Sequence, residues 1–338
     1  MGIKPAASEN RTASKPRNRA KKRVAVIFHP DKIARRKLTA AIESAVMPLG
    51  WEPTLWLQTT AEEPGGQQAL RALAQGATHL LIAGGDGTIR EVVEALCLNE
   101  LGSKATLGIL PAGTGNVLAR NLKIDLYDLN SAVNRALHGN RHPIDLGLVR
   151  IINADGSRAE RVFSVMAGMG LDAKIMEKTD PKLKKAIGWV AYIDGGLKSL
   201  PTLFERMDVS VDNREPRNLK VVSLIIGNVG WLPGKITLMP DASLEDGILD
   251  VAAVSPRRFW NWIDFWGRVT WVQNLRENRQ LRHLIDQTAD VKTLENLNGK
   301  KIRVTPENPV FIQLDGDPMG SVLEAEFEVQ PRAVTIRL

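Results

Sequence analysis

The sequence predicts a two-part chain, in which an α/β part with a parallel sheet precedes a β-rich part. Apolar strand-like runs alternate with helical patterns over residues 24–116, as in a parallel sheet covered on both faces. After Arg141 the apolar runs are short and separated by turn residues, which is typical of an antiparallel sandwich or barrel. The strands expected there lie at 145–152, 161–165, 207–211, 219–226, 235–238, 248–254, 301–305, 310–314, 325–329 and 334–337. The 338 residues, 43% hydrophobic and 25% charged, leave room for two globular domains.

Residues 1–23 form a basic tail, which we expect to be disordered. The tail carries eight basic residues against one acidic residue, Glu9, and this excess accounts for the whole net charge of +7. It lacks the apolar stretch of a secretory signal, and Ala6 stands where N-myristoylation needs serine or threonine. Attraction to anionic lipid or to nucleic acid is the alternative to a solvated arm, and of the two nucleic acid is not the expected partner.

The first part contains four strands separated by helical segments. The expected elements are a strand at 24–28, a helix at 33–48, a strand at 51–57, a helix after Gly65-Gly66, a strand at 80–83, a helix from Ile89 and a strand at 106–110. Polar or glycine-rich residues follow each strand. Because ligands bind beyond the carboxyl ends of parallel strands, these segments predict a binding crevice.

The third strand runs directly into Gly84-Gly85-Asp86-Gly87-Thr88, followed by a helical pattern. Glycines at the start of a helix allow a tight turn and leave backbone N–H groups exposed, and the helix dipole then favours a phosphate. Asp86 would repel a phosphate unless Mg²⁺ lies between them, so the loop predicts a metal–nucleotide site. A plain strand–helix turn explains the glycines but not the aspartate and threonine together.

A second loop contains Gly113-Thr114-Gly115-Asn116 and distinguishes between families that share the first loop. The first loop is shared by NAD kinases, phosphofructokinases and lipid kinases. However, residues 110–122 closely resemble the matching loop of diacylglycerol and sphingosine kinase catalytic domains. Further segments fit bacterial members of that family in chain order, at 144–147, 167–173, 244–251 and 314–317. The resemblance covers residues 24–338 and leaves only the basic tail outside.

The resemblance implies an α/β nucleotide-binding domain at 24–140 and a β-sandwich domain at 141–338, with the active site in the cleft between them. The last strands are expected to pack back towards the first domain. Family members transfer the γ-phosphoryl group of ATP to a lipid hydroxyl.

Most of the implied ligands fall on the two loops. Gly84, Gly85, Asp86, Gly87, Thr88, Thr114 and Asn116 would hold the nucleotide, with Asp86 reaching Mg²⁺ directly or through water. Thr60, or Thr59, would face the adenosine. A second, structural Mg²⁺ would be bound by Asp246 with the carbonyls of Ser243 and Ile248, since hard oxygen ligands suit that ion.

The family's proposed general base is the acidic residue that ends an Asp-Gly-Glu triplet. Here the triplet is Asp315-Gly316-Asp317, so the base falls on Asp317, whose side chain is one methylene shorter. Aspartate serves as the base in protein kinases, so the change is compatible with phosphoryl transfer. An ordinary hairpin turn is the alternative interpretation of this triplet. Asp145 and Lys184 match further polar positions near the family's cleft.

Two positions depart from the family pattern. His29 stands before Pro30 where the family tends to have asparagine, so the nucleotide contact there is expected to differ. Val117 stands where many bacterial members have aspartate, although sphingosine-kinase-like members carry an apolar residue. The departure at Val117 bears on which lipid is the acceptor, and not on phosphoryl transfer itself.

A helical segment at 257–285 is rich in tryptophan and arginine. Residues 259–272 alone contain four of the eight tryptophans. Such a composition suits the membrane interface, but a helix docked on the sandwich or in a dimer contact explains it equally well.

The sequence therefore predicts a cytoplasmic lipid kinase, dependent on ATP and Mg²⁺, that associates peripherally with membranes and phosphorylates a diacylglycerol-like lipid. The alternatives are a sphingoid-base or other lipid kinase, an NAD kinase, and a nucleotide-sensing membrane-binding regulator without turnover. A homodimer is left open.

Overall fold

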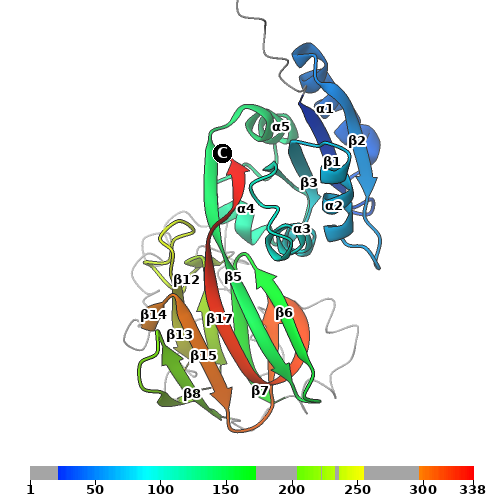
Figure 1. The fold of residues 1–338 in the computed structure, drawn as a ribbon. Helices are drawn as coiled ribbons and strands as arrows, with labels where there is room; N and C mark the ends of the chain where they lie inside the picture. The colour runs from blue at the N-terminus through cyan, green and yellow to red at the C-terminus, as the bar shows by residue number, and fades with distance from the viewer. Residues whose placement is uncertain (1–21, 173–203, 222, 233–235, 255–296) are drawn as a thin grey trace, which may run out of the picture.

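The computed structural model describes residues 22–172, 204–221, 223–232, 236–254 and 297–338, and shows an α/β part beside a β-rich part (Figure 1). Residues 1–21 of the basic tail, Lys184 and the tryptophan-rich segment 257–285 lie outside the described residues, whereas Arg23 begins the first strand. In the part of the chain that the structure describes, none of the helices combines the length and the apolar character that crossing a bilayer needs.

The α/β part is a parallel sheet with helices on both faces. Its elements are β1 (Arg23–Phe28), α1 (Arg35–Val46), η1 (Met47–Leu49), β2 (Glu52–Gln58), α2 (Gly66–Ala74), β3 (His79–Gly84), α3 (Asp86–Leu98), β4 (Thr106–Pro111), α4 (Val117–Asn121) and α5 (Leu129–His138). The strands lie in the order β4-β3-β1-β2, and each neighbouring pair is parallel. The expected strands are therefore present, within one or two residues at their ends.

Apolar side chains alternate along these strands and supply two cores. On β1, Ala25 and Ile27 pack with α2 and α3, whereas Val24, Val26 and Phe28 pack with α1 and α5. Successive side chains of a strand point to opposite faces, so a continuous apolar strand must be covered on both sides. Because helices cover both faces of the sheet, the polar loops lie at the ends of the strands.

The β-rich part is predominantly antiparallel. Its elements are β5 (Arg141–Asn153), β6 (Arg158–Phe163), β7 (Met166–Asp172), β8 (Glu205–Val211), β9 (Arg217–Val221), β10 (Ser223–Gly227), β11 (Trp231–Leu232), β12 (Ile236–Thr237), β13 (Leu249–Val254), β14 (Leu297–Gly299), β15 (Lys301–Pro306), β16 (Val310–Leu314) and β17 (Asp317–Arg337). Its own core contains large side chains such as Phe163 and Phe327, which meet edge to face. The predicted fold class, an α/β part followed by a β-sandwich, is confirmed.

Three details of this part differ from the sequence interpretation. Residues 219–226 were expected as one strand but divide between β9 and β10, and β7 was not expected as a strand. Residues 325–329 and 334–337 were expected as two strands but belong to one, β17. The residues between them look like a turn, yet the structure accommodates them as a register shift between Gln330 and Val334, with Arg332 at a φ of 53°.

The long strand β17 connects the two parts of the molecule (Figure 1). It pairs with β16, β15 and β5 in the β-rich part, and its end pairs in parallel with β4 at Thr335 and Ile336. The same strand begins at Asp317, so the predicted base lies at the start of the element that joins both sheets.

Candidate active site

The two glycine loops lie against each other at the carboxyl ends of β3 and β4. A Cβ atom added to Gly113 would lie 2.6 Å from the Cα of Gly85, a separation that real Cβ atoms do not reach. The Gly84 carbonyl also accepts a hydrogen bond of 3.0 Å from the Ala112 amide. Only residues without a side chain permit this approach, so the structure brings both sequence motifs into one site.

Asp86 lies in the first turn of α3, because the helix begins at Asp86 and includes Gly87 and Thr88. Its Oδ1 accepts hydrogen bonds from the amides of Val117, at 2.7 Å, and Leu118, at 3.4 Å. Burial raises the pKa of Asp86, and the charge of Asp315 adds to this effect, while the backbone N–H bonds oppose it. The carboxylate thus joins the first loop to the second, and its two hydrogen bonds do not offset the cost of removing its charge from water.

Asn116 holds the second loop together. It adopts the left-handed conformation, with a φ of 48°. Its side-chain amide donates to the Gly113 carbonyl at 2.7 Å, and its side-chain oxygen accepts from the Gly113 amide at 3.0 Å. Its side chain is buried, whereas Thr114 is exposed at the tip of the loop. In this structure the contacts of Asn116 are therefore those of a loop-shaping residue.

The two threonines after β2 differ in exposure. Thr59 is buried, and its hydroxyl lies 3.4 Å from the Phe28 carbonyl. Thr60 is exposed, and its hydroxyl accepts a hydrogen bond of 3.1 Å from the Glu63 amide. Of the two, Thr60 has the side chain that a nucleotide could reach. Its role stays a prediction.

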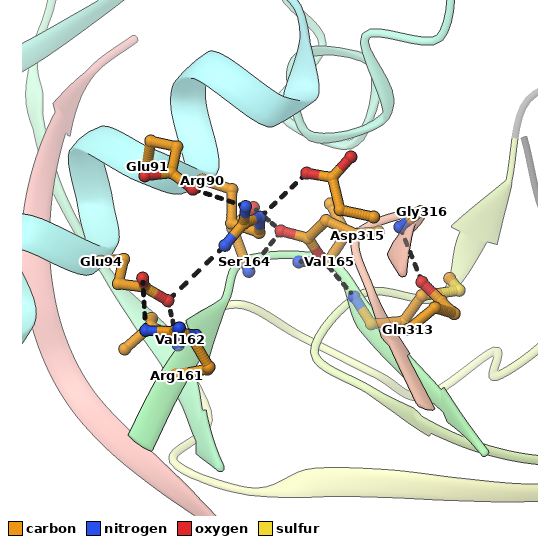
Figure 2. Close-up of polar contacts among 12 residues, drawn as sticks. Arg90, Glu91, Glu94, Arg161, Val162, Ser164, Val165, Gln313, Asp315 and Gly316 are labelled. Carbon is orange, nitrogen blue, oxygen red and sulfur yellow. Dashed lines mark hydrogen bonds and ion pairs between the residues drawn. The ribbon is translucent and has the colours of Figure 1, made fainter. Parts of the chain in front are cut away.

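Asp315 is half-buried at the turn between β16 and β17, with its carboxylate turned towards protein groups (Figure 2). Its carboxylate accepts hydrogen bonds from the amides of Ser164, Val165 and Met166 and from the Ser164 hydroxyl, at 2.8–3.0 Å. Burial raises its pKa, and these hydrogen bonds act in the opposite direction. The aspartate that begins the triplet therefore anchors the turn to the segment between β6 and β7.

Asp317 lies at the first glycine loop, although 229 to 233 residues separate it from that loop in the sequence. A Cβ atom added to Gly87 would lie 3.4 Å from Asp317 Oδ2. The same oxygen accepts a hydrogen bond of 3.1 Å from Arg90 Nε. The structure thus brings together Asp86, Gly87 and Asp317 from the two parts of the chain.

The predicted second metal site lies in the loop before β13. Asp246 Oδ1 accepts a hydrogen bond of 3.1 Å from the Ile248 amide, and the Ser243 hydroxyl lies 3.3 Å from the Glu245 amide. Burial, together with the charge of Asp145, raises the pKa of Asp246. Asp145 itself accepts the amides of Gly247 and Arg332, each at 2.7 Å, and so ties this loop to β17. A Mg²⁺ ion here would depend on Asp246 and on backbone carbonyls.

Sequence reasoning missed several charged residues of the site, which are Arg90, Glu91 and Glu94 on α3. Their spacing on the helix was visible, but their partners were not, because Asp317 and β6 lie far away in the sequence. Among the described residues, no group of three histidine, cysteine, aspartate or glutamate side chains is arranged to bind a metal.

Two glycine loops packed together beside the carboxylates of Asp86 and Asp317 are the arrangement expected of a kinase. Residues 23–149 match the diacylglycerol kinase catalytic domain, and residues 164–338 match the YegS C-terminal NAD kinase beta sandwich-like domain. The chain is 26% identical to the diacylglycerol kinase of Bacillus subtilis over 90% of this chain and 93% of that protein. It is 32% identical to a probable lipid kinase YegS-like of Pseudomonas aeruginosa, over 69% of this chain and 72% of that protein.

A solved structure described as a diacylglycerol kinase from Bacillus anthracis has the same fold, with a TM-score of 0.70 and 18% identity over 94% of this chain and 96% of that chain. The chain therefore belongs to the family of diacylglycerol kinases and YegS-like lipid kinases. The predicted family and enzyme class, a lipid kinase, are confirmed.

Proposed function

We propose that this kinase transfers the γ-phosphoryl group of ATP to a hydroxyl of a diacylglycerol-like lipid, with Mg²⁺ as the metal. The observation that carries the proposal is the position of Asp317, a half-exposed carboxylate against Gly87 in the first turn of α3. This arrangement supplies an acceptor for a hydroxyl proton beside a loop that suits a phosphate.

The two glycine loops support ATP as the donor. Gly85 and Gly113 approach too closely for side chains, so neither residue covers the loop amides with a side chain. The amides at the start of α3 have no helical partner and carry the positive end of the helix dipole. We expect Gly84, Gly87, Thr88 and Thr114 to bind the phosphates, and Thr60 to face the adenosine.

The surroundings of Asp86 fit a divalent cation. Its side chain is half-buried, and burial together with the charge of Asp315 raises its pKa, so a positive charge there would relieve an unfavourable environment. Mg²⁺ is commonly bound by one or two carboxylates together with substrate phosphates and water, without a cage of protein ligands. When bound, the ion would neutralise charge on the phosphates. Asp246, with the carbonyls of Ser243 and Ile248, is proposed to hold a second ion.

Asp317 is proposed as the general base. A lipid hydroxyl is a weak nucleophile, and a carboxylate within hydrogen-bond reach accepts its proton as the bond to phosphorus forms. Asp315 does not compete for this role, because its oxygens accept four hydrogen bonds from protein groups. The turn that carries both aspartates is thereby held in place.

The acceptor is inferred from the relatives, whose names include a diacylglycerol kinase and probable lipid kinases. A sphingoid base is the main alternative. Since such an acceptor resides in a bilayer, we propose peripheral membrane contact, to which the basic tail and segment 257–285 would contribute.

The test is phosphate transfer from labelled ATP to a panel of lipids in mixed micelles, with diacylglycerol and a sphingoid base as separate samples. We expect Mg²⁺-dependent labelling of diacylglycerol, and a loss of about 10²-fold or more in kcat for Asp317→Asn. Asp155→Asn, which changes an exposed aspartate in the β5–β6 turn, is the matched control and should retain full turnover. Unchanged turnover in Asp317→Asn would exclude the base, and labelling of the sphingoid base alone would exclude the diacylglycerol acceptor.

A further inference from the structure

Arg90 occupies a central position between the two parts of the molecule (Figure 2). It lies on α3, four residues and so about 6 Å along the helix axis after Asp86. Its side chain is 7% exposed, and each of its three guanidinium nitrogens faces a different carboxylate. Nε donates to Asp317 at 3.1 Å, Nη2 donates to Glu91 at 2.6 Å, and Nη1 lies 3.6 Å from Glu94.

Asp317 depends on this arginine for its orientation. Its side chain is 46% exposed, and Arg90 is the partner of its carboxylate among the described residues. Asp317 is therefore accessible to a substrate, while the group that holds it is not. A buried guanidinium fixes the direction of a carboxylate better than a lysine ammonium does, because its donors form a planar and rigid fork.

Glu94 holds the other side of Arg90. Its Oε2 accepts a hydrogen bond of 2.8 Å from the Val162 amide of β6, and its Oε1 lies 3.9 Å from Arg161. Burial raises the pKa of Glu94, while the Val162 hydrogen bond and the charge of Arg90 oppose this effect. The β-rich part thus holds Glu94, Glu94 holds Arg90, and Arg90 in turn orients Asp317.

The arginine itself stays charged and engaged. Burial alone would lower its pKa, but the charges of Asp317, Glu91 and Glu94 outweigh burial and raise the pKa above its ordinary value. Since its nitrogens all face protein carboxylates, Arg90 is better placed to hold side chains than to bind a phosphate.

We infer that Arg90 is a positioning residue that holds the carboxylate of Asp317 at a set distance from the phosphate loop. This inference rests on the proposed role of Asp317 as the base. Asp86 and Arg90 lie one turn apart on the same helix, so a single rigid element places the metal–nucleotide site and the base relative to each other. Arg90 acts on the reaction only through Asp317.

The test is a double-mutant cycle between Arg90 and Asp317, because a residue that acts through another loses its effect when the second is removed. The enzymes are the wild type, Arg90→Met, Asp317→Asn and the double variant, assayed for kcat and for the KM of ATP. We expect Arg90→Met to lower kcat about 10²-fold, the usual effect of misplacing a catalytic group by about 1 Å. The KM of ATP should change less than about threefold. The double variant should have the kcat of Asp317→Asn.

Arg150→Met is the matched control, because Arg150 also contacts three carboxylates, those of Glu160, Glu326 and Glu328, but lies on the exposed face of the β-rich part. It should retain the kcat of the wild type. The thermal unfolding of each variant is measured as well, because Arg90→Met leaves Glu94 without its buried partner and is expected to destabilise the protein. If Arg90→Met does not fold, the same cycle is measured with Arg90→Lys, which keeps the positive charge but lacks the planar guanidinium. The kcat of Arg90→Lys should fall about tenfold.

The outcomes separate the inference from the function on which it rests. If the kcat losses of the two single variants multiply in the double variant, or if Arg90→Met has full turnover, the positioning role is overturned while Asp317 remains the base. Full turnover in Asp317→Asn would overturn both. Equal kcat values for the double variant and Asp317→Asn, with the single Arg90 variant impaired, would support the inference.

Discussion

Three aspartates of the site have different environments, and their partners explain why. Asp315 is enclosed by the amides of the segment between β6 and β7, Asp86 accepts amides at the start of α4, and Asp317 contacts the guanidinium of Arg90. Backbone N–H groups stabilise a buried carboxylate without making it accessible, whereas an exposed carboxylate beside one cation can still meet a substrate. Three residues of similar chemistry therefore differ in accessibility: Asp315 anchors the turn, while Asp86 and Asp317 have the proposed roles of metal ligand and base.

At the residue scale, replacing Asp86 by asparagine should stabilise the metal-free protein and abolish its turnover. The change keeps an acceptor for the Val117 amide but removes a half-buried charge. We expect the melting temperature at pH 7 to rise by about 2–4 °C, which corresponds to about 1 kcal/mol in a domain of this size, and kcat to fall at least about 10²-fold.

The pH dependence of this effect follows from the raised pKa of Asp86. As the pH rises above the ordinary pKa of aspartate, the unfolded state loses its proton before the folded state does, so stability falls until the raised pKa is passed. Melting curves between pH 4 and 8 without metal should show this fall in the wild type and a smaller fall in the variant. Identical pH profiles would contradict the assignment.

At the scale of elements, the site depends on contacts between loops that belong to different strand–helix units. Gly85 follows β3 and Gly113 follows β4, and each leaves space for the backbone of the other. The short helix α4 begins where Asp86 accepts its first amides, so the second loop is shaped by a residue of the first. Neither loop would keep its conformation alone.

Replacing Gly113 by alanine should therefore separate the loops. The added Cβ would lie 2.6 Å from Gly85 Cα and 2.9 Å from Asn116 Oδ1. We expect a loss of about 1–3 kcal/mol in stability, the usual result of overpacking, and a loss of at least tenfold in ATP affinity, measured by calorimetry.

Gly156→Ala is the control for this change. Gly156 has a φ of 82° and open space around its Cα, so alanine there is strained by about 1 kcal/mol without touching the site. ATP affinity should be unchanged. An equal loss of affinity in both variants would show that stability, and not the contact between the loops, determines binding.

At the scale of the whole molecule, β17 makes the two parts one structure. It pairs with β5 along most of its length and ends beside β4, and Val334 and Ile336 at its end are buried in the core of the α/β part. The loop before β13 is tied to the same strand, because Asp145 accepts amides from both. We therefore expect the two parts to unfold together.

Two buried isoleucines test this expectation. Ile336→Ala creates a cavity in the α/β core and Ile302→Ala creates one in the sandwich core, and each should cost about 2–5 kcal/mol. If unfolding is cooperative, either variant lowers hydrogen-exchange protection in both β3 and β15 to a similar extent. A loss confined to the mutated part would show two independent units.

Much of the fold could be predicted, because its signals are local. Apolar runs such as that of β3, followed by glycines, identify buried strands, and the two glycine loops indicated both the nucleotide site and the family. The register shift within β17 was not predictable in this way, since the residues near Arg332 have the composition of a turn and only pairing with β5 keeps the strand continuous.

The sequence by itself determined the succession of strands and helices in the α/β part, the positions of the two glycine loops and the lipid kinase family, because each depends on residues close together in the chain. The tertiary structure decided which side chains act on one another. Arg90 and Asp317 are 227 residues apart and meet because β17 begins beside α3, a contact that no local pattern encodes. The same holds for Asp315, whose partners lie between β6 and β7: a charged residue acquires its role from the long-range contacts that compensate its charge.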